Sequence, residues 1–211
     1  MQDKVDTMII AAHDDDEALM CGGYIAKYAN KKKILVVSCV ACTNEQLNAA
    51  EINARKFGYE YLPIRLKQWN VELHNLARIL SEEFVLHSPD TVITHPAFDT
   101  HQEHKLVNAA VEIASRSIDM RGVGNNYIYN ILYGYGTGAY ENSDIWQKPN
   151  VFLTLEPQEI ERKKEMLLQY GKEMRGTRTG GHAITDAMFW GKLINSQYAE
   201  AYLTKRILLN E

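Results

Sequence analysis

AAHDDDE, at residues 11–17, places one histidine and three consecutive aspartates directly after an apolar run at residues 5–10. The apolar run is typical of a buried strand, and residues 18–30 have the composition of a helix. The polar cluster is therefore expected at the turn that leaves the carboxyl end of a strand. In open α/β sheets, this edge is where ligands bind.

Two explanations account for this acidic cluster. Neighbouring carboxylates repel one another unless a cation or a helix amino end compensates their charge. A divalent metal would use both the carboxylates and His13 as ligands. An acidic helix N-terminus is the alternative, because Asp is a common cap and acids suit a first turn. It does not account for His13, and residues 11–17 alone leave both explanations open.

A second polar cluster follows a short β-branched strand at residues 91–94. It reads HPAFDTHQEH (residues 95–104) and precedes a helical run at 105–120. His101 and His104 are three residues apart, so both project to one side if they lie on a first helical turn. His13 and Asp16 have the same spacing. The two clusters meet in one cleft if their strands lie close together in a parallel sheet.

Strands and helices alternate through the first part of the chain, which predicts a parallel sheet with right-handed crossovers. The expected fold is α/β, a Rossmann-like three-layer α/β/α sandwich. Strands are expected at 5–12, 34–41, 59–66, 91–94, 127–133 and 151–155, and helices at 17–30, 47–57, 71–87, 105–120, 158–170 and 183–198. Pro63 favours an edge position for its strand. The turn after the first strand lacks the glycines that bind a dinucleotide.

Composition agrees with a compact enzyme. The chain has 211 residues, 45% hydrophobic residues and a formal net charge of −4, which favours one domain over residues 1–211. Residues 1–120 would form the Rossmann-like half with the polar clusters, and 121–211 the substrate-side elements. We see no basic stripe for nucleic acid, no apolar run near the roughly 20 residues of a membrane span and no signal peptide. A cytoplasmic location is expected, and the sequence does not determine the oligomeric state.

Three segments resemble one protein family. Residues 12–17, AHDDDE, resemble the Ala-His-Pro-Asp-Asp-Glu motif of the LmbE-like (PIG-L) deacetylases. Asp99-x-His101-x-x-His104 resembles the second motif of that family, Asp-x-His-x-x-His. YAEAY, at residues 198–202, is similar to its C-terminal Ala-Glu-Ala-Phe region. The resemblance covers most of the chain and implies the fold and activity of a metal-dependent N-acetylglucosaminyl deacetylase.

The resemblance assigns His13, Asp16 and His104 as metal ligands and Asp15 as the general base. Two histidines and one carboxylate, with open positions for water, suit catalytic zinc, and Fe²⁺ accepts the same ligands. Such a metal lowers the pKa of its bound water towards roughly 7 and polarises a carbonyl. His101 is expected to stabilise the oxyanion or to protonate the leaving amine.

Other residues near the motifs are expected to support the site. Asp99 is predicted to fix the tautomer of His101. Glu17 is expected to cap the helix or support the ligands, and His95 to be structural or to support the ligands.

The chain also departs from the family pattern. Asp14 stands where the family usually has proline, which adds a charge near the expected metal. Glu45 replaces a glycine in the loop after the second strand. KQWN, at residues 67–70, replaces a loop that in many members holds an Asp-Gly pair thought to face the sugar. The indole of Trp69 would either stack on a sugar ring or fill a surface groove, and the sequence favours neither.

The expected activity is hydrolysis of an N-acyl, above all an N-acetyl, group from an amino sugar or its conjugate. An amidase for a thiol conjugate or an N-formyl sugar shares this chemistry. The alternatives outside catalysis are a sugar- or metal-binding module and a nucleotide-binding regulator. The glycine-rich segment 171–182, with Arg175 and Arg178, is a candidate lid over an anionic substrate.

Overall fold

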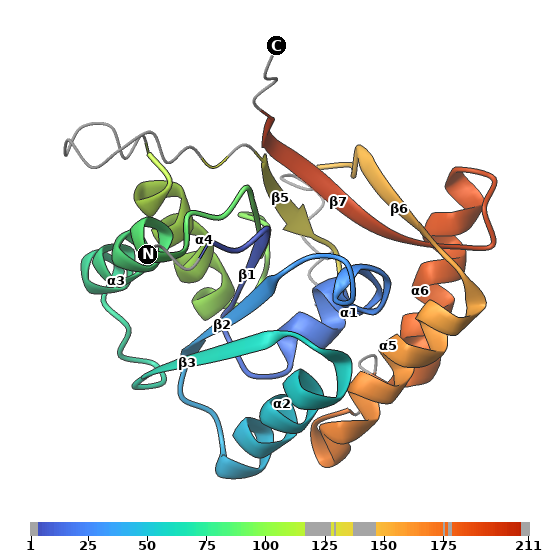
Figure 1. Cartoon of the computed structure of the whole chain (residues 1–211), viewed down its shortest axis with the longest axis horizontal. Helices are drawn as coiled ribbons and strands as arrows, with labels where there is room; N and C mark the ends of the chain where they lie inside the picture. The colour runs from blue at the N-terminus through green and yellow to red at the C-terminus, as the bar shows by residue number, and fades with distance from the viewer. Residues whose placement is uncertain are drawn as a thin grey trace.

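A computed structural model describes residues 4–116, 128, 130–136, 147–174, 176 and 179–207 (Figure 1). In these ranges, one seven-stranded sheet has the order β3-β2-β1-β4-β5-β7-β6. The strands are β1 Thr7–Ala11, β2 Ile34–Val40, β3 Glu60–Leu66, β4 Thr91–Thr94, β5 Asn130–Gly134, β6 Val151–Leu155 and β7 Tyr198–Ile207. Strands β1 to β5 pair in parallel, and β7 runs antiparallel to β5 and β6. The predicted three-layer α/β fold with a mainly parallel sheet is confirmed.

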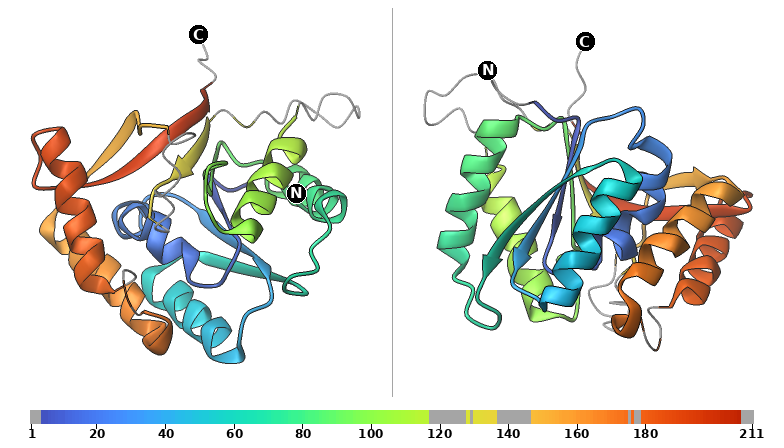
Figure 2. Two further views of the ribbon diagram at one scale, coloured as in Figure 1. Left: turned by 180° about the vertical axis from the view of Figure 1, so that it is seen from behind. Right: turned by 60° about the horizontal axis from the view of Figure 1, so that its bottom comes forward.

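Helices cover both faces of the sheet, as the views in Figure 2 show. One layer contains α1 Asp16–Tyr28, α2 Asn44–Phe57 and α5 Pro157–Gln169, and the other contains α3 Leu73–His87 and α4 Gln102–Ala114. Helix α6, Gly180–Leu193, packs against α5 and β7, and a short 3-10 helix spans Gly171–Glu173. No helix in the described ranges is both long and apolar enough to cross a membrane.

Strand β1, the middle strand of the five parallel ones, shows why its sequence is apolar from residue 8 to residue 11. Ile9 and Ala11 of β1 belong to the core under α1, α2 and α5. Met8 and Ile10 belong to the core under α3 and α4. Side chains alternate between the two faces of a strand, so a strand covered on both faces is apolar at every position.

The predicted elements lie where the sequence placed them, but several boundaries were wrong, as at α4, which spans Gln102–Ala114 instead of 105–120. Thr43 and Gln46 form a capping box at the start of α2, and Pro63 lies in the edge strand β3, as expected. The helix predicted at 183–198 ends instead at Leu193, and β7 begins at Tyr198. Asn195 has a left-handed backbone with φ 58°, a conformation that Asn tolerates better than most residues and that stops a helix.

The order of the strands brings the two polar clusters together. The chain passes from β1 to β2 and β3 on one side, and then returns to β4 on the other side of β1. Ile10 pairs with Thr94 in register, and Thr94 Oγ1 donates a hydrogen bond to the Ile10 carbonyl at 3.0 Å. The loops after β1 and β4 therefore emerge side by side, at the switch point where open sheets bind ligands.

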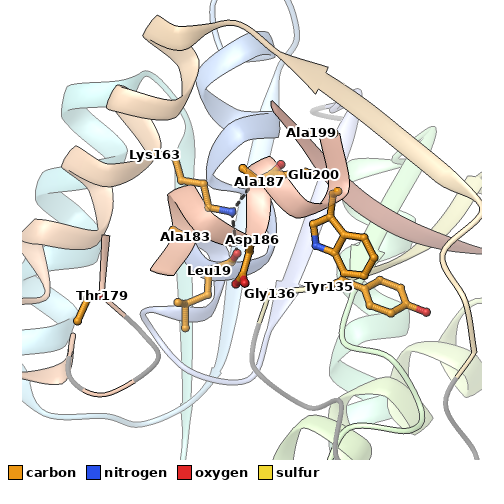
Figure 3. Close-up of a pocket in the computed structure, with 11 residues that line it drawn as sticks. Leu19, Tyr135, Gly136, Lys163, Thr179, Ala183, Asp186, Ala187, Ala199 and Glu200 are labelled. Carbon is orange, nitrogen blue, oxygen red and sulfur yellow. Dashed lines mark hydrogen bonds and ion pairs between the residues drawn. The ribbon is translucent and has the colours of Figure 1, made fainter. Parts of the chain in front are cut away.

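A buried carboxylate ties the helix after β1 to the far end of the chain. Glu200 of β7 accepts hydrogen bonds from the Gly23 and Tyr24 N–H groups of α1 at 2.7 and 2.8 Å. It also accepts from Lys163 Nζ at 2.6 Å and from the Tyr202 hydroxyl at 2.7 Å. Figure 3 shows Lys163 reaching between α1 and Glu200, where it also donates to the Leu19 carbonyl at 2.9 Å.

The same contact explains the two glycines inside α1. A Cβ at Gly22 would lie 2.7 Å from Lys163 Cγ, and a Cβ at Gly23 would lie 2.8 Å from Glu200 Cδ. No side chain fits at that distance. The glycines lower helix propensity by about 1 kcal/mol each, and the close approach of α1 to Lys163 and Glu200 offsets this cost.

Candidate metal centre

The three predicted ligands each direct one atom to a common point. His13 Nδ1 lies 3.2 Å from Asp16 Oδ2, and His104 Nε2 lies 3.3 Å from both. His13 follows β1, Asp16 is the first residue of α1, and His104 lies on the first turn of α4. In a tetrahedral zinc site with Zn–N bonds of 2.0–2.1 Å, ligand atoms are about 3.3 Å apart. The spacing of these three atoms therefore fits one such ion.

Two carboxylates set the tautomers of the histidines. Glu103 Oε2 lies 2.8 Å from His13 Nε2, and Asp99 Oδ2 lies 2.8 Å from His104 Nδ1. Each carboxylate accepts a hydrogen bond, so those ring nitrogens carry the protons. The lone pairs of His13 Nδ1 and His104 Nε2 then face Asp16, which is the arrangement that metal-ligating histidines use.

Asp99 differs from its sequence-based prediction. We expected its carboxylate to fix the ring of His101, but Oδ2 is paired with the ring of His104 and Oδ1 accepts the backbone N–H of His101 at 2.8 Å. The turn between β4 and α4 brings residue 99 back against residue 104, a folding of the loop that residue spacing does not reveal. The carboxylate supports a predicted ligand directly.

His95 lies in the same cluster as a further histidine. Its ring is fully buried and stacks on the ring of His104, with centroids 3.9 Å apart and planes 14° apart. His95 Nε2 lies 3.4 Å from Asp16 Oδ2, so His95, Asp16 and His104 form a second possible ligand group. His95 Nε2, however, accepts the Ala12 N–H at 2.9 Å. Because that lone pair is engaged, we assign the third ligand position to His13.

The charges in this cluster favour a cation. Burial opposes protonation of His13, but the hydrogen bond and charge of Asp16 outweigh it and raise the pKa of His13 to about 9. Burial is likewise outweighed at His104, where the charge of Asp16 contributes most to raising the pKa to about 10. Burial disfavours the Asp16 carboxylate, yet the charge of His104 holds its pKa well below the usual range. A bound divalent ion would supply the same positive charge without these protons.

The four acids of residues 14–17 have separate environments, which argues against a simple acidic cap. Asp14 Oδ1 accepts hydrogen bonds from Ser38 and Tyr61 at 2.5 Å each, so its charge is directed towards β2 and β3. Glu17 Oε1 accepts hydrogen bonds from Tyr59 and Tyr170 at 3.1 and 2.6 Å.

Asp15 has a different environment. It occupies the N-cap position of α1 but makes no capping hydrogen bond with its side chain. It instead borders a cavity of about 420 Å³ beside the ligand atoms. His13 and His101 also line this cavity, and its other walls include Thr43, Gln46, Gln68 and Glu173. Asp15 is thus buried in the protein yet borders an open cavity.

The tautomer of His101 follows from its position at the start of α4. Its Nδ1 accepts the backbone N–H of Glu103 at 3.3 Å, so the proton is on Nε2. Burial and the charge of His104 lower the pKa of His101, which favours the neutral ring. A neutral imidazole with a proton on Nε2 donates a hydrogen bond to a developing negative charge.

Glu103 is a residue of this cluster that the sequence analysis did not single out. It lies between His101 and His104, and acids are common in the first turn of a helix, so its sequence environment gave no distinct signal. Its contact with His13 depends on β1 and β4 being adjacent. Arg175 and Arg178, the basic residues of the predicted lid, lie outside the described residues.

Removal of the Asp99 carboxylate is expected to weaken metal binding. In Asp99→Asn, one of the two oxygens that face the His101 N–H and the His104 ring becomes an NH2 group, which cannot accept a hydrogen bond. Loss of such a supporting partner typically lowers metal affinity about 10- to 100-fold, and calorimetric titration with Zn²⁺ measures the change. Asp90→Asn is the control, because Asp90 lies at the opposite end of β4 and pairs with Lys4 on the surface. Equal affinity in the two variants would contradict this role.

Comparison with known proteins identifies solved structures that have the same fold. Neither a family model nor a curated protein sequence matches this chain. A conserved protein of Thermus thermophilus has a TM-score of 0.83 and 16% identity, with 98% of this chain and 97% of that chain covered. The 4-carboxy-2-hydroxymuconate hydratase GalB of Pseudomonas putida has a TM-score of 0.78 and 17% identity, with 97% and 98% covered.

The N,N'-diacetylchitobiose deacetylase of Pyrococcus horikoshii has a TM-score of 0.68 and 17% identity, with 95% of this chain and 84% of that chain covered. The chain therefore has the fold of the LmbE/PIG-L-type deacetylases, and the resemblance found in the motifs is confirmed for the fold. Because a hydratase has this fold too, the fold alone does not determine the reaction, which depends on the residues of the site.

Proposed function

We propose that this chain is a metal-dependent hydrolase of the LmbE-like family that removes an N-acetyl group from an amino sugar or its conjugate. The observation that carries the proposal is the convergence of His13 Nδ1, Asp16 Oδ2 and His104 Nε2 beside a cavity of about 420 Å³. Cavities of roughly 300–1,000 Å³ are typical of small-molecule sites.

His13, Asp16 and His104 would hold the cation, and the donor set suits zinc, with ferrous iron as the alternative. When bound, the cation polarises a carbonyl and lowers the pKa of water. Asp15 borders the same cavity and is proposed to accept a proton from the attacking water. It then delivers that proton to the leaving amine, so that amide and water become carboxylic acid and amine.

His101 is proposed to stabilise the negative charge that develops on the carbonyl oxygen. Its Nδ1 accepts a hydrogen bond from the Glu103 N–H, so Nε2 carries the ring proton. The Nε2–H group then donates a hydrogen bond to the oxyanion. Asp99, Glu103 and His95 act on the rings of His13 and His104 and are positioning residues.

The substrate class rests on the motifs and on one structural neighbour. The Pyrococcus horikoshii protein is a deacetylase of N,N'-diacetylchitobiose, which supports an N-acetylated amino sugar. An amidase for a thiol conjugate or an N-formyl sugar would use the same residues. The metal-binding half of the site is common to these reactions, and the walls of the cavity select among them.

Release of amine from defined amides tests this proposal. Zinc-loaded protein is incubated with N-acetylglucosamine, N,N'-diacetylchitobiose and N-formylglucosamine, and free amine is measured. We expect amine from at least one N-acetyl sugar, loss of release with a chelator and recovery when Zn²⁺ is returned. Stoichiometric zinc without amine from any of these amides would contradict the proposed hydrolase activity.

A further inference from the structure

The function proposed above leaves open what the substrate presents beside its amide. We infer that Trp69 is a specificity-determining residue that stacks against the apolar C–H face of a pyranose ring while the N-acyl group enters the metal site. This inference rests on the proposed function and names the feature of the substrate that this chain recognises.

Trp69 is an exposed aromatic residue next to two residues that line the cavity. It is 61% exposed, although tryptophan is usually well buried. Its indole lies against the ring of His101, with centroids 5.7 Å apart and planes 32° apart. Both His101 and Gln68, the residue before Trp69, line the cavity. A ring bound above His101 therefore lies within reach of the indole.

The backbone of Trp69 is held in an unfavourable conformation. The Asn70 N–H donates to the Lys67 carbonyl at 3.1 Å, which closes a tight turn. Trp69 is the third residue of that turn and has φ 61°, a left-handed conformation usually taken by Gly or Asn. Such a conformation persists only where the surroundings enforce it, and residues of this kind cluster at ligand sites.

One hydrogen bond holds Trp69 in this position, and a second ties the end of the preceding strand to the cavity wall. The Trp69 N–H donates to Glu103 Oε1 at 2.8 Å, and the other oxygen of that carboxylate holds His13. Arg65, at the end of β3, donates through Nη2 to the Cys42 carbonyl at 3.3 Å, and Cys42 is part of the cavity wall. The backbone of Trp69 is thus held one carboxylate away from a predicted ligand.

The other walls match a hydroxylated ring. Thr43, Gln46, Gln68 and Glu173 supply hydroxyl, amide and carboxylate groups around the cavity. Hydroxyl groups of a sugar bond to such side chains at the ring edge, while its C–H face needs an apolar surface. Trp69 supplies a rigid surface of this kind with little conformational entropy to lose.

Paired substrates test the inference. Zinc-loaded protein is given methyl N-acetyl-β-glucosaminide, which has the ring, or N-acetylethanolamine, which carries the acetamido group without it. In Trp69→Ala, we expect KM for the glucosaminide to rise about tenfold with kcat within about twofold, and kinetics on the acyclic amide to be unchanged. Trp69→Phe should recover most of the loss. Phe189→Ala removes another exposed aromatic side chain, on α6, and should change neither KM nor kcat for either substrate.

A binding measurement separates this inference from the proposed function. Titration of the zinc-loaded protein with methyl N-acetyl-β-glucosaminide should change tryptophan fluorescence saturably in the wild type, and the change should disappear in Trp69→Phe. If fluorescence responds in this way but no amine is released, stacking stands and the hydrolase proposal fails. If amine is released but Trp69→Ala affects both amides equally, or the fluorescence change survives in Trp69→Phe, the inference is wrong.

Discussion

Asp15→Asn is expected to lower kcat about a thousandfold while the protein keeps its metal, because general-base catalysis typically contributes 10²–10⁴-fold. Asp15 borders the cavity, whereas its neighbour Asp16 directs Oδ2 to the ligand atoms. The substituted amide has nearly the same shape but does not accept a proton at neutral pH. Metal content and the rate of amine release are measured on the same preparation.

The Asp15 variant also separates an enzyme from a binding module. A module that only binds a sugar needs no base, so its ligand affinity would be the same with Asn at this position. Loss of activity with full metal occupancy would support the role of Asp15. Activity within about tenfold of the wild type would contradict it, and loss of the metal would show that Asp15 contributes to the ligand set.

Glu200→Ala is expected to destabilise the folded protein by about 3–5 kcal/mol, the usual cost of removing one partner of a buried ion pair. Lys163 and Glu200 are both nearly inaccessible to solvent, with side chains 7% and 3% exposed. In the variant, the buried Lys163 ammonium loses its carboxylate partner and keeps only the hydrogen bond to the neutral Leu19 carbonyl. The Gly23 and Tyr24 N–H groups also lose the side-chain oxygens that accept from them. Urea unfolding monitored by circular dichroism gives the change in free energy.

The neighbouring surface pair is a matched control for this prediction. Lys164 and Glu161 lie 3.3 Å apart on α5, with side chains 39% and 65% exposed. Glu161→Ala should change stability by less than about 1 kcal/mol, since exposed ion pairs contribute little. Similar losses in Glu161→Ala and Glu200→Ala would contradict the importance that we assign to burial of the Lys163–Glu200 pair.

The sequence was sufficient to predict the layers of the fold and the neighbourhood of the site. Apolar runs with polar residues at their carboxyl ends located the strands that carry His13 and His104. The spacing of each cluster was consistent with a short turn entering a helix, and α1 and α4 begin there. These signals are local, and parallel topology then brings neighbouring loops together.

Contacts between distant segments could not be predicted. Glu103 reaches His13 across the β1–β4 boundary, and His95 stacks on His104 from the end of β4. Asp99 contacts His104 because of the path of one loop. The strained turn at Trp69 is likewise invisible in the sequence, since KQWN contains no Gly, and only one Asn, to mark a left-handed residue.

Metal stoichiometry in the wild type and in His104→Ala tests the central claim most directly. Purified protein is stripped with a chelator, supplied with Zn²⁺, freed of excess ion and analysed by mass spectrometry. We predict close to one zinc per wild-type chain and a large loss in His104→Ala, with circular dichroism showing that the variant remains folded. Equal zinc in both proteins, or no zinc in the wild type, would contradict a metal centre formed by His13, Asp16 and His104.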